Sequence, residues 1–112
     1  MAVRLEKAWE PLGEEALKHL HGHLGVYELA DASGKTFFIG YAGGRSRYGL
    51  RGELEEQLRR RPGQELQFRV EVNMSYLSRS EELLMAHRAD HGQLPEENVR
   101  EPRRKLGRLS PH

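Results

Sequence analysis

The chain has 112 residues, the length of a single domain, and contains no cysteine. The lack of cysteine excludes a disulfide scaffold, a zinc ribbon and a thiol nucleophile. The longest apolar runs are only a few residues, far short of the roughly 20 that span a bilayer, and the start has no apolar signal segment. We therefore expect a cytoplasmic protein that has no membrane partner.

The charges are unevenly distributed along the chain. Lys and Arg number 18 and Asp and Glu number 17, which gives a net charge of +1. Residues 99–112 carry a net +4 and residues 1–98 a net −3, and the segment 38–52 contains three arginines and no acid. Because steering of a phosphate backbone depends on the local potential, near-neutrality does not exclude a nucleic-acid partner.

The N-terminal half predicts a short helix followed by a β-hairpin. The helix covers residues 14–20 and is stopped by Gly22. The next two segments, 24–30 and 35–41, are rich in β-branched and aromatic residues. They are separated by Asp-Ala-Ser-Gly, which is typical of the turn of an antiparallel hairpin.

The C-terminal half predicts a helix, a strand and a second helix. Leucine recurs every fourth residue in the segment 48–60, which indicates the apolar stripe of a helix. The segment 65–73 alternates strictly between apolar and polar residues, so we expect a strand that is covered on one side only. Ser78-x-x-Glu81 fits a capping box that opens a helix through about His91. We expect no further regular element after residue 94.

This order of elements predicts an α/β fold with a small three-stranded antiparallel sheet flanked by helices. The core domain is expected over residues 24–99. A lead-in with the short helix precedes it in residues 1–23, and a basic tail follows in residues 100–112. We expect the tail to be a disordered terminus; the alternative is an arm that binds nucleic acid.

Two groups of histidines invite interpretation as metal sites. His19, His21 and His23 alternate but straddle a predicted helix end, whereas zinc needs three or four convergent ligands. His87 and His91 are one helical turn apart, but the glutamate of the HExxH motif is absent between them. We expect surface histidines in both groups.

A glycine-rich run, Gly40-Tyr-Ala-Gly43-Gly44, follows a predicted strand and precedes a helix. Backbone N–H groups in such a place can hold a phosphate, although the run matches neither GxGxxG nor the P-loop. Arg45, Arg47 and Arg51 follow it closely, and guanidinium groups bind phosphate in a bidentate manner. These arginines are therefore candidate nucleic-acid-binding residues.

Several of these features together resemble a known family. Gly25-Val26-Tyr27, Phe38-Ile39-Gly40, a basic loop, an arginine-bearing helix, a strand, a glutamate-led helix and then Pro95 and Asn98 resemble the GIY-YIG nuclease superfamily. The resemblance covers about residues 24–99 and follows the order of the predicted elements. It implies a GIY-YIG-like fold, DNA as the partner, and phosphodiester hydrolysis assisted by Mg²⁺ or Mn²⁺.

The resemblance also implies roles for particular residues. In that family two tyrosines, a helix arginine and a helix glutamate surround the phosphodiester, and the glutamate holds the metal ion. Tyr27 matches the first tyrosine, and Arg51 matches the arginine, with Arg47 as the alternative. Asn98 matches the late asparagine that ties the end of the domain to the site.

Two departures from the family pattern concern the catalytic groups. Phe38 stands where the second motif has tyrosine, and Tyr41, three residues on, is expected to point to the opposite face of the strand. Ala86 stands at the metal-binding glutamate and cannot supply an oxygen ligand. Glu82 and Asp90 are one helical turn away on the same face, and we take Glu82 as the candidate metal ligand.

The sequence therefore predicts a nucleic-acid-binding protein with a GIY-YIG-like fold and an atypical or lost hydrolytic site. The candidate catalytic residues are Tyr27, Tyr41 and Arg51, and the candidate nucleic-acid contacts are Arg45, Arg47, Arg51 and Asn98. The alternative is a non-catalytic module that retains the fold and binds a protein partner.

Overall fold

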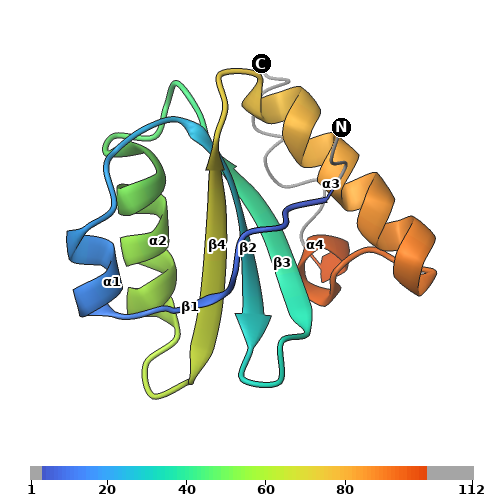
Figure 1. The fold of residues 1–112 in the computed structure, drawn as a ribbon, viewed down its shortest axis with the longest axis horizontal. Helices are drawn as coiled ribbons and strands as arrows, with labels where there is room; N and C mark the ends of the chain where they lie inside the picture. Colours follow the sequence, from blue (N-terminus) through green and yellow to red (C-terminus); the bar gives the residue numbers. More distant parts are fainter. Residues whose placement is uncertain (1–3, 101–112) are drawn as a thin grey trace.

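The strands form one antiparallel sheet in the computed structural model, which describes residues 4–100. The elements in chain order are β1 (Glu10–Pro11), α1 (Glu14–Lys18), β2 (Gly25–Asp31), β3 (Thr36–Ala42), α2 (Gly49–Arg60), β4 (Leu66–Val72), α3 (Tyr76–His91) and α4 (Glu96–Arg100). The strand order is β1-β4-β2-β3. Figure 1 shows α1 and α2 on one side of the sheet and α3 on the other. The fold is therefore α/β, as predicted.

The predicted hairpin of β2 and β3 forms the centre and one edge of the sheet. Its turn is held by Asp31, whose Oδ1 accepts hydrogen bonds from the N–H groups of Ser33 (2.9 Å) and Lys35 (3.0 Å). Gly34 has a φ of 91°, a left-handed conformation that glycine adopts without steric cost. The short Asp-Ala-Ser-Gly segment therefore reverses the chain as the sequence indicates.

Helices cover both faces of the sheet, which gives two apolar clusters. The larger cluster lies between the sheet and the helices α1 and α2, and its buried members are Leu12, Leu17, Tyr27, Leu29, Ala42, Leu50, Leu54, Leu66, Phe68 and Val70. The smaller cluster lies on the α3 side and contains Leu5, Val26, Ile39 and Leu83. The alternation predicted for β4 is confirmed through Val70, whereas Val72 is 56% exposed.

The sheet has four strands, so the predicted count of three is wrong. β1 pairs with β4 through Glu10↔Phe68 and Pro11↔Gln67. Two residues are too few to show an alternating pattern, and proline is tolerated only at a sheet edge. Leu12 and Leu17 follow β1 into the larger cluster. The predicted lead-in is therefore packed into the same unit as the segment that follows it.

The predicted capping box at the start of α3 is wrong. The helix begins at Tyr76, with Ser75 at the N-cap, so Ser78 and Glu81 lie inside it. The N–H of Ser75 donates to Oδ1 of Asn73 at 2.8 Å, which fixes the turn before the helix. The pattern matched a first turn that starts three residues too late.

A further helix, α4, follows Pro95, where the sequence predicted no regular structure. Its five residues are fewer than two helical turns, so no apolar period can develop. Proline followed by Glu96 and Glu97 is the one pattern typical of a helix start here. Within residues 4–100, no helix is long and apolar enough to cross a membrane. The predicted tail beyond residue 100 lies outside the described residues.

Candidate functional site

Tyr27 lies in the core beneath α2. Its side chain is 1% exposed, and its hydroxyl accepts a hydrogen bond from Nε2 of Gln57 at 3.2 Å. Burial is the main cause that raises the pKa of the Tyr27 hydroxyl well above the ordinary tyrosine value, and the charge of Glu53 adds to it. The hydroxyl is therefore neutral at physiological pH and is held away from solvent.

The residue opposite Tyr27 is Gly40, and this pairing makes room for the ring. A Cβ atom at Gly40 would lie 2.6 Å from the end of the Tyr27 ring, so any other residue type would force the buried ring to shift. The Phe38 ring contacts the Tyr27 ring at a centroid distance of 6.0 Å. The two motif positions that the resemblance pairs are thus neighbours on one face, as aromatic packing partners.

Gln57 was not predicted as part of any site. It is 5% exposed, and its Oε1 accepts from Nε of Arg61 at 3.2 Å while Arg61 also pairs with Glu97 of α4. Its position on the buried face of α2, beside the leucine stripe, was the available indication in the sequence. A buried amide needs hydrogen-bond partners, and this chain of contacts supplies them while linking β2, α2 and α4.

Tyr41 lies on the opposite face of the sheet from Phe38, as its spacing predicted, and therefore also from Tyr27. It pairs with Val26, and its ring stacks on Tyr76 of α3 at a centroid distance of 5.5 Å. The two tyrosines proposed as catalytic groups are therefore separated by the sheet itself. They do not converge on one substrate.

Arg51 lies on the side of α2 that faces α1. Its Nε donates to Glu55 one turn further along the helix at 3.2 Å, and both side chains are more than a third exposed. Together with Glu14 and Lys18 of α1 it lines a shallow cavity between the two helices. The structure does not bring Arg51 to the hydroxyl of Tyr27, which faces Gln57.

Asn98 fastens α4 to the free edge of β3. Its Oδ1 accepts from the N–H of Ile39 at 2.8 Å, and its Nδ2 donates to the carbonyl of Ile39 at 2.9 Å. An edge strand otherwise presents unpaired N–H and C=O groups. The asparagine therefore ties the end of the described chain to the sheet, and its amide is occupied by the main chain.

The face of α3 proposed for a metal ion holds an ion-pair network. Glu82 accepts from Nη1 of Arg79 at 3.0 Å, and Arg79 also donates to Glu71 through Nε at 2.8 Å. Ala86 is 7% exposed and packs inward. Within residues 4–100 no group of three His, Asp or Glu side chains could hold a metal ion. With a guanidinium beside Glu82, these residues do not fit a divalent cation at this place.

Two arginines without an ion-pair partner among residues 4–100, Arg45 and Arg47, lie where three connections meet at one end of the sheet. The start of β2 pairs with the ends of both β3 and β4, through Gly25↔Ala42 and Gly25↔Val72. Figure 1 shows the α1–β2, β3–α2 and β4–α3 connections together at this end. We call the exposed basic and aromatic residue types of this end the basic loop surface, which comprises His21, His23, Arg45, Arg47 and Tyr48.

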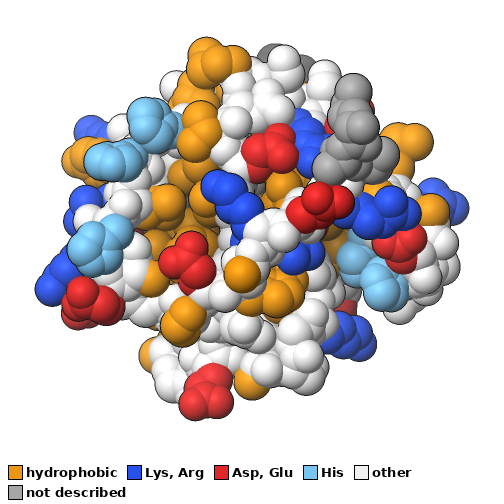
Figure 2. All heavy atoms as spheres, in the orientation of Figure 1, with side chains coloured by type: hydrophobic (Ala, Val, Ile, Leu, Met, Phe, Trp, Pro, Cys, Tyr) orange, Lys and Arg blue, Asp and Glu red, His pale blue; other side chains and the backbone are white. Residues whose placement is uncertain are grey.

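The basic loop surface is exposed and built on close backbone contacts. Tyr48 is 63% exposed, and the guanidinium of Arg47 lies 6.0 Å from its ring centroid. The carbonyl of His23 accepts from the N–H of Leu50 at 2.8 Å, which joins the α1–β2 connection to the start of α2. Figure 2 shows histidine side chains gathered over this connection. Arg45 and Arg47 make no ion pair within residues 4–100.

The glycine-rich run does not present its N–H groups as a phosphate cradle. The N–H of Gly43 donates to Oγ of Ser46 at 3.1 Å, and the N–H of Gly44 donates to the hydroxyl of Tyr76 at 3.1 Å. Ser46 in turn donates to Glu53 at 2.8 Å. The run therefore shapes the loop, and any anion would meet side chains rather than these two amides.

The fold and the surface define a small α/β domain, with helices on both faces of a four-stranded antiparallel sheet and a basic end. Residues 3–90 match a family described as a domain of unknown function, DUF7508, so the chain belongs to that family. No curated protein matches the chain. No solved structure matches it either.

Proposed function

We propose that the protein binds nucleic acid through the basic loop surface and does not cut it. The observation that carries the proposal is Tyr48, a 63% exposed aromatic ring with Arg45 and Arg47 just before it. Exposed aromatic rings provide stacking platforms for unpaired bases, and each stacked base contributes about 1–3 kcal/mol. Single-stranded nucleic acid is therefore the preferred ligand.

The charge of this surface supports the same ligand. Arg45 and Arg47 are exposed and have no carboxylate partner within residues 4–100, whereas Arg51 is paired with Glu55. Guanidinium groups that are not already neutralised displace counterions from phosphates, which is the main source of affinity for a nucleic-acid backbone. The nucleic-acid contacts proposed here are accordingly Arg45 and Arg47 rather than Arg51 or Asn98.

The interior geometry supports binding without hydrolysis. A base or a water-orienting group must lie within hydrogen-bond reach of the reacting atoms. The hydroxyl of Tyr27 is buried, neutral and bonded to Gln57, and Tyr41 lies on the other face of the sheet. Ala86 supplies no oxygen ligand for a metal ion. The residues that match the GIY-YIG pattern are therefore not arranged for the metal-assisted hydrolysis of that family.

Fluorescence anisotropy of a labelled single-stranded oligonucleotide tests the binding. We expect Arg45→Ala combined with Arg47→Ala to weaken the affinity about tenfold at low salt. The matched control is Arg59→Ala combined with Arg88→Ala, which removes the same charge from exposed positions on α2 and α3. Equal losses in the two double variants would mean that net charge, and not this surface, governs binding.

Tyr48 provides a second, charge-independent test. Tyr48→Phe retains a stacking ring and should bind like the natural protein, whereas Tyr48→Ala should bind roughly fivefold or more weakly. Incubation of plasmid and branched DNA with Mg²⁺ or Mn²⁺ completes the set and should leave both substrates intact. Metal-dependent cleavage that Tyr27→Phe abolishes would overturn the non-cutting part of the proposal and establish a nuclease.

A protein-interaction module is the second candidate, and exposed apolar side chains near the same end favour it. Met74, just before α3, is 76% exposed; Leu77, in the first turn of α3, is 56% exposed, and Met85 further along the helix is 71% exposed. Methionines are frequent at adaptable binding surfaces. If no oligonucleotide binds at low salt, this becomes the leading function, and Met74→Glu or Leu77→Glu are the variants to examine against a partner.

A further inference from the structure

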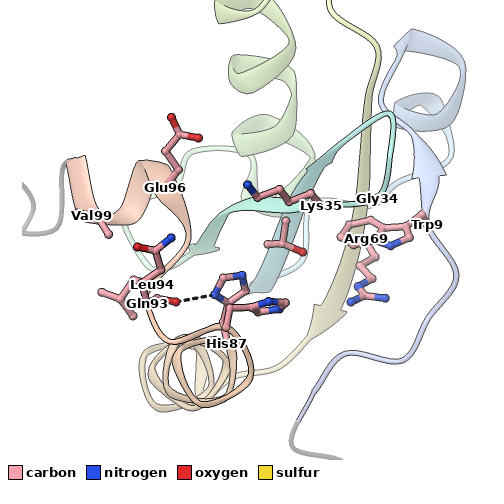
Figure 3. A pocket seen from close by; sticks show the side chains of 11 residues that line it. Trp9, Gly34, Lys35, Arg69, His87, Gln93, Leu94, Glu96 and Val99 are labelled. Atoms are coloured by element: carbon pink, nitrogen blue, oxygen red, sulfur yellow. Dashed lines mark hydrogen bonds between the residues drawn. The ribbon is translucent and has the colours of Figure 1, made fainter.

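A cavity of about 680 Å³ lies at the other end of the sheet, beside the turn between β2 and β3. It is bounded by this turn, by β4 with the segment before β1, by the C-terminal part of α3 and by α4, as Figure 3 shows. Pockets that hold small organic ligands have volumes of about 300–1,000 Å³. The cavity is therefore of the right size for a ligand, and no part of the basic loop surface contributes to it.

Lys35 lines the cavity and lies on a turn that is held by hydrogen bonds. Lys35 follows Gly34, and its N–H is held by Asp31, whose carboxylate also accepts from the hydroxyl of Ser33 at 2.6 Å. These bonds lower the pKa of Asp31, the Ser33 hydroxyl most of all, so the carboxylate remains ionised and the turn is maintained. The backbone position of Lys35 is thus fixed before any ligand arrives.

One wall of the cavity is aromatic and electrically balanced. The guanidinium of Arg69 lies 4.0 Å from the ring centroid of Trp9, and its Nε donates to Glu28 at 2.8 Å. Glu28 is 6% exposed, and this ion pair with Arg69 compensates its charge inside the protein. Arg69 therefore holds Trp9 in place, while its own charge is already neutralised.

Two histidines of α3 form the facing wall. The ring centroids of His87 and His91 lie 4.3 Å apart. Nδ1 of His87 lies 3.1 Å from the carbonyl of Gln93, and a carbonyl can only accept, so Nδ1 carries the proton. Nε2 of His87 then accepts a hydrogen bond when the ring is neutral and donates one when the ring is protonated.

We propose that this cavity binds a small organic anion that carries a planar ring, such as a nucleoside monophosphate. The ring can pack against Trp9, on the face that Arg69 does not cover, and the anionic group can bind Lys35 and the histidines; Leu94 adds apolar surface on the opposite side of the cavity in Figure 3. Among the described residues that line the cavity, Glu96 is the one acid, and in Figure 3 its carboxylate points away from His87. The site is independent of the proposed nucleic-acid interface.

Trp9 is the only tryptophan of the chain, so its fluorescence reports on this cavity. Titration with adenosine monophosphate should change the Trp9 emission in a saturable manner. Adenosine alone and inorganic phosphate alone should each bind at least roughly tenfold more weakly, because each lacks half of the proposed contacts. Equal responses to adenosine and to its monophosphate would overturn the anionic part of the proposal.

Variants locate the binding. Lys35→Ala should weaken the binding of adenosine monophosphate about tenfold. Lys18→Ala removes the same charge from α1, and Tyr48→Ala disables the basic loop surface, so both should bind like the natural protein. The proposal is overturned if no saturable change occurs up to millimolar ligand, or if Lys35→Ala and Lys18→Ala bind equally well.

Discussion

Replacement of Asn98 by alanine tests whether α4 is held to the sheet as described. The variant removes two hydrogen bonds to Ile39, of 2.8 and 2.9 Å, at the edge of β3. A hydrogen bond in a folded protein contributes about 1 kcal/mol net, so the free energy of unfolding should fall by about 2 kcal/mol. For a domain of this size that corresponds to a decrease of about 10 °C in the melting temperature.

Urea unfolding measures the loss, and amide hydrogen exchange shows where it arises. The N–H of Ile39 should exchange faster in the variant, whereas the N–H of Gly40, which points toward β2, should keep its protection. Well below its melting temperature the variant should bind the oligonucleotide normally. A loss of less than about 0.5 kcal/mol, or unchanged exchange at Ile39, would refute this role; weakened binding by the folded variant would restore Asn98 as a nucleic-acid contact.

Three further substitutions test other parts of the description. The hydroxyl of Tyr27 makes one buried hydrogen bond, so Tyr27→Phe should lower the free energy of unfolding in urea titrations by about 1 kcal/mol. The affinity for the oligonucleotide should not change, and a binding defect would contradict a role in packing alone. Hydrogen bonding to Arg79 lowers the pKa of Glu71, so this stabilisation is fully present above the unfolded value of about 4.3 and is lost as the pH falls through the folded pKa. Arg79→Met should therefore make the free energy of unfolding fall less steeply as the pH is lowered on the acid side. An unchanged pH profile would contradict this role of Arg79. Gly49 and Gly63 both have positive φ, but only a Cβ at Gly49 would meet backbone atoms, at 2.2 Å. Gly49→Ala should therefore lower the melting temperature more than Gly63→Ala, and equal effects would show that the close contact relaxes.

Long periodic segments explain why the central elements could be predicted. The alternation of the segment 65–73 and the leucine stripe of 48–60 are both repeated over several residues, and β4 and α2 lie there. β1 has two residues and α4 has five, so each is shorter than two repeats of its own periodic pattern. Their positions depend on partners far along the chain, β4 for β1 and the backbone of Ile39 for α4, and such partners leave no local trace in the sequence.

The site residues illustrate the same limit. The spacing of Phe38 and Tyr41 on one strand predicted that their side chains point to opposite faces, and this is confirmed. The sequence could not show that Gln57 donates a hydrogen bond to the hydroxyl of Tyr27, or that Arg79 donates one to the carboxylate of Glu82. Both contacts form only when the helices are packed in the fold. The resemblance to a nuclease family identified positions, whereas the contacts at those positions determine what the side chains can do.

The salt dependence of single-stranded oligonucleotide binding tests the proposed function most directly. If Arg45 and Arg47 each neutralise one phosphate, their joint replacement by alanine should reduce the slope of log K against log salt by about 1.4, at about 0.7 for each contact. The Arg59→Ala, Arg88→Ala control should keep the slope of the natural protein. Identical slopes in all three proteins, or no binding at low salt, would contradict a nucleic-acid interface on the basic loop surface.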